Sequence, residues 1–166
     1  MKITGCIILF CVTLFCCGYI VWRERKRMEQ SAAFRRLFEF VYERCKYYQM
    51  PLKEIYESFA DETLEKTGIL EILRKGERGL PYSNFFVTAF DKCKEEFCFS
   101  QKESALIREF GSVLKTIAYD ECERLEYYLN DISKQDTFIK SEFSKRVKLK
   151  VSLSLAAGFA LIILII

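Results

Sequence analysis

The chain has 166 residues, with 26 Lys and Arg, 23 Asp and Glu, and no histidine. This length provides for one domain with membrane anchors and is too short for two domains of ordinary size. The absence of histidine removes the commonest general base, and the sequence contains neither a GxxxxGKS/T phosphate loop nor a GxSxG nucleophile motif. We therefore predict a protein that is not an enzyme and that has no catalytic residues, no cofactor and no metal site.

Charged residues are segregated along the chain. None occurs within 3–22 or within 151–166, although they make up 30% of the sequence. The first segment has about the 20 residues that an α-helix needs to cross a hydrocarbon core of roughly 30 Å. The second segment reaches that length as 147–166 when Lys148 and Lys150 extend their ammonium groups toward the lipid headgroups. We predict a transmembrane helix in each segment.

Basic residues flank both predicted spans on the side of the intervening segment, 23–146. Because positive flanks stay on the cytoplasmic side, we expect a protein of the cell membrane with two spans and a cytoplasmic domain. Between the flanks, residues 28–144 contain 17 basic and 22 acidic residues, a net charge of −5, which argues against nucleic acid as a partner. The flanks themselves favour membrane lipid as a partner. The residues predicted to set the topology are Arg23, Arg25, Lys26, Arg27, Lys145, Arg146, Lys148 and Lys150.

A cleaved signal peptide at the N-terminus and a zinc site in the intervening segment are two interpretations with less support. A cleaved signal peptide would use Lys2 as its basic start, but no small-residue cleavage site followed by a neutral stretch is present. A zinc site made from Cys45, Cys93, Cys98 and Cys122 would lack any CxxC spacing. Disulfides between these cysteines are not expected in a reducing cytoplasm.

Helical periodicity dominates the segment between the spans. Apolar residues recur three or four positions apart from Phe34 to Tyr48, and Pro51 suits the first turn of a second helix. Ser100 begins a sequence with the form of a capping box, which predicts the start of another helix. The sequence predicts an all-α fold, an antiparallel bundle of about six helices between an N-terminal and a C-terminal transmembrane helix. The remaining predicted helices are 62–73, 82–97 and a long helix from about Asp120 into the second span.

Two segments with small residues indicate close packing. Gly111 lies inside a predicted helix, where glycine costs about 1 kcal/mol relative to alanine. It is interpreted as a close backbone approach or a partner contact, with a tolerated surface glycine as the alternative. In the second span, Ala156, Gly158 and Ala160 would allow another helix to approach closely, and the first span is a candidate.

Two short motifs carry a family resemblance. The segment Tyr48-Gln49-Met50-Pro51-Leu52-Lys53-Glu54 resembles a family segment of the form Pro-Leu-x-Glu, and the segment from Leu106 to Leu114 resembles a Phe-Gly-x-x-Leu segment. With the order of spans and helices, the chain resembles the stage III sporulation protein AB family over nearly its full length. It departs from the family where Lys115 replaces a glycine and where Arg124 stands in place of a glutamine.

The resemblance implies a non-catalytic platform or adaptor of the sporulation channel complex between mother cell and forespore. The family's cytoplasmic domain is similar to that of the platform protein of type II secretion and type IV pilus machines, which binds a hexameric ATPase. The resemblance also implies a location on the mother-cell side of the outer forespore membrane, with the complex's ATPase and other membrane components as partners. The candidate partner contacts are Pro51, Leu52, Glu54, Phe110, Gly111 and Asp120.

Two other function classes remain open at the level of sequence. One is a two-span membrane sensor or regulator whose helical domain binds a small ligand in a pocket. The other is a membrane enzyme that uses carboxylates. Its candidates would be Glu95, Glu96, Asp120, Glu121 and Glu123, although such clusters on amphipathic helices usually face solvent.

Overall fold

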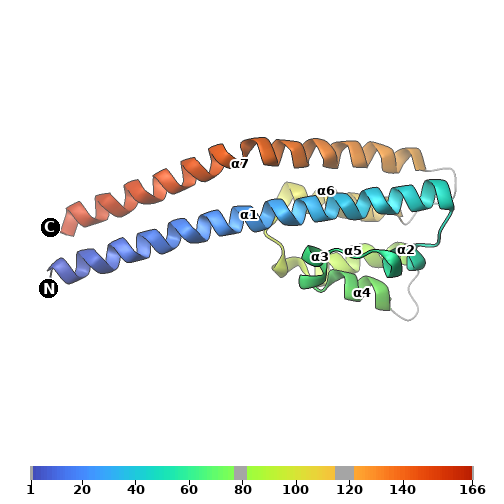
Figure 1. Ribbon diagram of the computed structural model, residues 1–166, viewed down its shortest axis with the longest axis horizontal. Helices are drawn as coiled ribbons and strands as arrows, with labels where there is room; N and C mark the ends of the chain where they lie inside the picture. Colours follow the sequence, from blue (N-terminus) through green and yellow to red (C-terminus); the bar gives the residue numbers. More distant parts are fainter. Residues whose placement is uncertain (1, 77–81, 115–121, 166) are drawn as a thin grey trace. The chain divides into compact units, whose positions relative to one another are not determined.

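The computed structural model describes residues 2–76, 82–114 and 122–165, with side chains over 5–76, 85–114 and 125–163. In these ranges the fold is all-α, with seven α-helices, one short 3-10 helix and no strand (Figure 1). The helices in chain order are α1 (Lys2–Tyr48), α2 (Leu52–Ser58), α3 (Glu62–Lys66), α4 (Ile69–Lys75), α5 (Tyr82–Lys92), η1 (Lys94–Glu96), α6 (Gln101–Val113) and α7 (Cys122–Ile165).

The chain forms two compact units. The terminal unit contains residues 1–26 and 138–166, and the central domain contains residues 27–137. Helices α1 and α7 contribute to both units, since α1 runs for 47 residues and α7 for 44. The predicted long last helix that continues into the apolar C-terminal segment is therefore confirmed.

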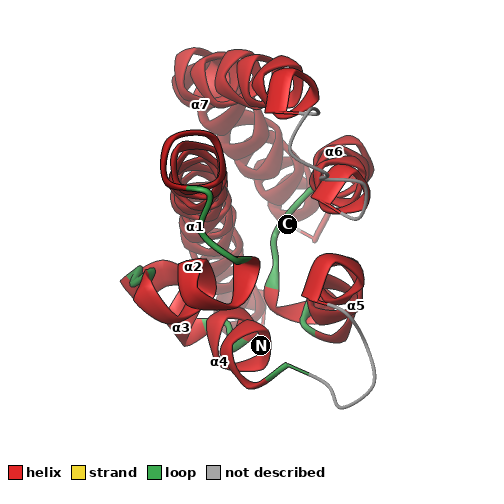
Figure 2. Cartoon of the chain, turned by 90° about the vertical axis from the view of Figure 1, so that its right-hand side faces the viewer, coloured by secondary structure: helices red, strands yellow, loops and turns green. Residues whose placement is uncertain are grey.

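The core of the central domain is aromatic and centres on α1. Phe34 packs edge-on against Phe90 at 5.8 Å between ring centroids. Phe38 stacks on Phe110 of α6 at 3.7 Å and contacts Phe86 of α5 at 5.7 Å. These five rings are at most 2% exposed. Phe34 and Phe38 lie on the face of α1 that the three- and four-residue spacing predicted, and the other three rings come from α5 and α6. Figure 2 looks along the long helices and shows α1 on one side, with α2, α3 and α4 below it and α5 and α6 on the opposite side.

The predicted helix over 62–73 is wrong in its extent. The structure has two short helices there, α3 and α4, separated by Gly68 with φ +78°. Only glycine adopts this left-handed conformation readily, and it lets the chain turn so that Leu64 and Leu70 both face the core. The predicted helix over 82–97 likewise ends early, at Lys92, before the 3-10 turn η1.

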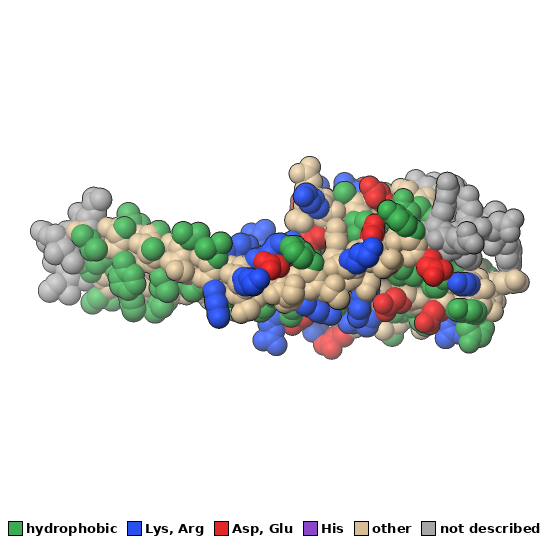
Figure 3. Space-filling view, turned by 90° about the horizontal axis from the view of Figure 1, so that it is seen from above, with side chains coloured by type: hydrophobic (Ala, Val, Ile, Leu, Met, Phe, Trp, Pro, Cys, Tyr) green, Lys and Arg blue, Asp and Glu red, His purple; other side chains and the backbone are tan. Residues whose placement is uncertain are grey.

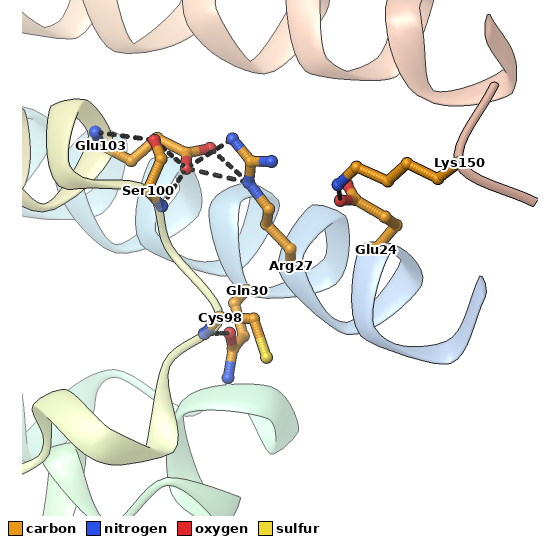
Figure 4. Close-up of polar contacts among 7 residues, drawn as sticks. All are labelled: Glu24, Arg27, Gln30, Cys98, Ser100, Glu103 and Lys150. Carbon is orange, nitrogen blue, oxygen red and sulfur yellow. Dashed lines mark hydrogen bonds and ion pairs between the residues drawn. The ribbon is translucent and has the colours of Figure 1, made fainter. Parts of the chain in front are cut away.

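The start of α6 is the capping box that the sequence predicted. The Ser100 backbone donates to Glu103 Oε2 at 2.7 Å, and the Glu103 backbone donates to Ser100 Oγ at 3.4 Å (Figure 4). Just before it, Gln30 of α1 donates to the Glu96 carbonyl at 2.9 Å and accepts from the Cys98 backbone at 2.9 Å. These bonds join the segment between α5 and α6 to α1.

One buried hydroxyl has no hydrogen-bond partner among the described residues. Tyr56 of α2 is 0% exposed, and its hydroxyl oxygen makes no hydrogen bond. Burial raises the pKa of this phenol because the charged phenolate would be desolvated. Tyr56 is therefore a neutral core residue, and its ring contributes packing.

The terminal unit is a pair of antiparallel helix ends, with the N and C ends side by side (Figure 1). The closest approach is at Gly158, where an added Cβ would lie 2.4 Å from Thr13 Oγ1. Thr13 Oγ1 in turn donates to the Leu9 carbonyl at 2.8 Å, so its polar group is satisfied inside α1. The close packing predicted for the small residues of the second apolar segment is thus confirmed at Gly158, and its partner is the first segment.

Candidate functional site

The most exposed part of the segment that carries the family resemblance is the turn from α1 to α2. We define the α1–α2 corner as Arg44, Tyr47, Tyr48, Pro51 and Glu54. Tyr47 and Tyr48 are 68% and 65% exposed, and Pro51 and Glu54 are exposed as well. Exposed tyrosine beside arginine is typical of protein interfaces, because both side chains combine apolar area with hydrogen-bonding groups.

Local geometry holds this corner in place. Gln49 adopts φ +52°, which reverses the chain after α1, and the Met50 backbone donates to the Arg44 carbonyl at 3.2 Å. The Arg44 guanidinium lies 5.0 Å from the Phe40 ring and 4.8 Å from the Tyr48 ring. Leu52 is half-buried and packs against the core. The exposed side chains therefore project from a fixed turn.

A polar cluster lies beside the corner, where α1 meets the first turns of α7. Tyr42 donates to Glu126 Oε2 at 2.8 Å, and Lys46 donates to the Tyr42 hydroxyl and to Glu126 at 3.3 Å. The hydrogen bond from Tyr42, with help from Lys46, lowers the pKa of Glu126. The bond to Tyr42 raises the pKa of Lys46, so both groups carry their charges at neutral pH.

Phe110 and Gly111 are placed by the structure inside the core, so they do not present a surface for a partner. Phe110 is 0% exposed against Phe38, and an added Cβ on Gly111 would lie 2.4 Å from Cδ1 of Phe86. The glycine is required because α6 packs closely on α5. Of the interpretations of Gly111, the structure supports close packing within the domain, and neither Phe110 nor Gly111 is an exposed contact residue.

The remaining acidic candidates do not form a visible site. Asp120 and Glu121 lie outside the described residues, and the Glu123 side chain is not described. Glu95 and Glu96 are exposed on η1. Among the described side chains, no group of three or more His, Cys, Asp or Glu is arranged to hold a metal ion.

The basic residues predicted to set the topology make different contacts. In the central domain, Arg27 forms an ion pair with Glu103 of the capping box, with Nη2 at 2.8 Å from Oε2 (Figure 4). In the terminal unit, Lys150 donates to Glu24, and Lys145 donates to Glu142 at 3.1 Å. The exposed ones include Arg23, Arg25 and Lys148. Their role in topology remains a prediction.

Sequence reasoning missed two parts of these surfaces. Tyr48 belongs to the apolar stripe that the sequence predicts as a core face, because periodicity alone cannot show where the core ends. Tyr47 lies off that stripe, and nothing in the sequence marks it as a contact residue. Glu24 lies among the basic residues of the first flank, and the prediction considered only those basic residues. A single acidic residue in such a flank is a signal for a specific ion pair.

One part of α1 has the properties of a membrane span. Over Gly5–Tyr48 it is long enough and contains a stretch apolar enough to cross a bilayer, and that stretch is only 6% buried. Among the described residues no second helix meets the same measure of length and composition. The span predicted at 147–166 is therefore not identified in this way.

Comparison with known proteins identifies the family. Residues 2–166 match the family model described as stage III sporulation protein AB. No curated protein and no solved structure matches the chain significantly.

Proposed function

The chain belongs to the stage III sporulation protein AB family, whose members are components of the sporulation channel complex, and from this membership we propose that the protein is a non-catalytic membrane adaptor that docks a cytoplasmic ATPase. The complex's ATPase would bind the central domain, on the mother-cell side of the outer forespore membrane. The observation that carries the proposal is the exposed aromatic α1–α2 corner, which overlaps the segment that resembles the family motif at Tyr48, Pro51 and Glu54.

The corner has the composition of a docking site. Its two tyrosines supply apolar area with low conformational freedom, and Arg44 already stacks on Tyr48, so little ordering is needed on binding. Lys46 and Glu126 next to it supply charges of both signs at a fixed place. A partner surface with aromatic or apolar side chains and a polar rim would fit this arrangement.

We further propose that the terminal unit lies in the membrane as two spans. The apolar end of α7 packs along the apolar end of α1 through Gly158, and exposed large apolar side chains cover the outside of both helices. Examples are Phe15, 76% exposed, and Ile163, 75% exposed. Water would disfavour such a surface, and hydrocarbon would accept it.

The experiment uses the full-length protein in lipid nanodiscs and the purified ATPase of the complex. The variant Tyr47→Ser, Tyr48→Ser, Glu54→Lys should weaken binding at least tenfold, since interface tyrosines commonly contribute about 2 kcal/mol or more each when they are central. The control Glu62→Lys, Glu71→Lys changes exposed side chains of α3 and α4 and should bind as the wild type does. Equal binding by the corner variant, or no binding by the wild type, would refute docking at this surface.

A further inference from the structure

Basic side chains from both long helices gather at one level of the terminal unit. The ion pair between Glu24 of α1 and Lys150 of α7 fixes this level (Figure 4). At 1.5 Å per residue, Arg23 and Lys26 lie within about 3 Å of Glu24 along α1, and Arg146 and Lys148 within about 6 Å of Lys150 along α7. In Figure 3 blue side chains cluster where the green apolar stretch ends.

Most of this positive charge is not neutralised by the protein. Residues 23–26 and 145–150 hold seven basic and one acidic residue, a net charge of +6. Glu24 is only 8% exposed and is engaged by Lys150, while Lys145 is paired with Glu142. Within the described part of the chain, four cations at this level have no carboxylate partner. We call them the basic collar: Arg23, Lys26, Arg146 and Lys148.

Aromatic side chains indicate the depth of the collar. Trp22 is 55% exposed and Tyr19 is 50% exposed, with their rings 5.9 Å apart. Amphipathic rings of this kind settle at the level of the lipid headgroups. Lys26 Nζ lies 5.4 Å from the Trp22 ring, which places its ammonium at the same level. The collar would therefore face phosphate groups.

We propose that the basic collar binds the phosphate groups of anionic phospholipids in the cytoplasmic leaflet and enriches these lipids around the protein. This inference rests on the two-span placement proposed above. It goes beyond an orientation signal, because orientation requires only that the charges stay on one side during insertion. The collar joins cations from two helices that the Glu24–Lys150 pair holds together, and it borders exposed apolar surface, so an amphipathic anion matches both parts of the surface.

Trp22 is the only tryptophan in the chain and sits beside the collar, so its fluorescence reports on the adjacent lipid. The full-length protein is reconstituted into phosphatidylcholine vesicles that contain phosphatidylglycerol. Either lipid in turn carries brominated acyl chains, which quench nearby tryptophan. Brominated phosphatidylglycerol should quench as if enriched about fivefold next to Trp22, the ratio expected from the attraction of one basic side chain to an anionic surface.

The variant Arg23→Gln, Lys26→Gln, Arg146→Gln, Lys148→Gln should lose this preference, so that the two lipids quench equally. The matched control Lys53→Gln, Lys66→Gln, Lys75→Gln, Lys102→Gln removes the same charge from the central domain and should keep it. Equal quenching in the wild type, or a preference retained by the collar variant, would overturn the proposal. If α1 did not lie in the membrane, the result would be different, because neither brominated lipid would then quench Trp22.

Discussion

Two neighbouring residues of α6 show how burial changes the meaning of a motif. Phe110 and Gly111 resemble a family segment and were candidate partner contacts, yet both are buried between α6, α5 and α1. A substitution at either position is expected to disturb the fold, so a loss of partner binding there would not identify a contact residue. The exposed tyrosines of the α1–α2 corner are the better positions for testing a partner.

Gly111→Ala should destabilise the central domain by about 1–2 kcal/mol. The new Cβ would lie 2.4 Å from a carbon of Phe86, which is 1% exposed and has little room to move. This overpacking exceeds the gain of about 1 kcal/mol in helix propensity that alanine brings. The free energy of unfolding would be measured by chemical denaturation of the full-length protein in detergent, with circular dichroism as the signal.

The adjacent Ser112→Ala serves as the control for that experiment. Ser112 is exposed on the same helix, and its hydroxyl donates only to the Arg108 carbonyl within α6. Its replacement should change stability by less than about 0.5 kcal/mol. A Gly111→Ala protein as stable as the wild type would mean that the contact between α5 and α6 has room for a methyl group at this position.

At the scale of elements, sequence patterns predicted helices better than they predicted where helices end. The stripe of α1, the capping box of α6 and the length of α7 all depend on local spacing, which the sequence displays directly. The break at Gly68 was missed because the residues around it keep an apolar pattern through the turn. A glycine with positive φ and a glycine in a helix look the same in sequence, so only the packing of α3 and α4 decides between them.

The capping box of α6 is also the place where that helix is attached to α1. Glu103 is 7% exposed, and its carboxylate accepts from Ser100 and from Arg27 at once. Glu103→Gln should destabilise the central domain by about 2 kcal/mol, because it removes an ion pair and weakens the cap in a partly buried place. Thermal and urea denaturation of the full-length protein would measure the loss.

Glu65→Gln offers a comparison with a similar but exposed ion pair. Glu65 is 48% exposed by side chain and lies 3.1 Å from Arg74. Exposed pairs contribute little, so this variant should lose less than about 1 kcal/mol. Equal losses in the two variants would show that burial does not strengthen the contact between α6 and α1.

At the scale of the whole molecule, the two apolar segments raise the question of whether they pair within one chain or between chains. The sequence showed two segments and a set of small residues, but spacing alone does not identify the partner of a helix. The structure pairs Gly158 with Thr13, and the Glu24–Lys150 ion pair forms in the same unit. Two contacts of different chemistry thus support one register between the helices.

This register predicts a specific cross-link. An added Cβ at Gly158 would lie 3.1 Å from the Cβ of Thr13, close to the separation of about 3.5–4.5 Å found across disulfides. In a chain whose native cysteines are replaced, Thr13→Cys with Gly158→Cys should therefore form an intramolecular disulfide under mild oxidation in vesicles. Non-reducing electrophoresis and mass spectrometry would detect it.

The pair Thr13→Cys with Ala157→Cys is the control, because Ala157 is exposed on another face of α7 and should not cross-link within one chain. A disulfide that joins two chains instead would contradict this register and would mean that the apolar helices pair between molecules.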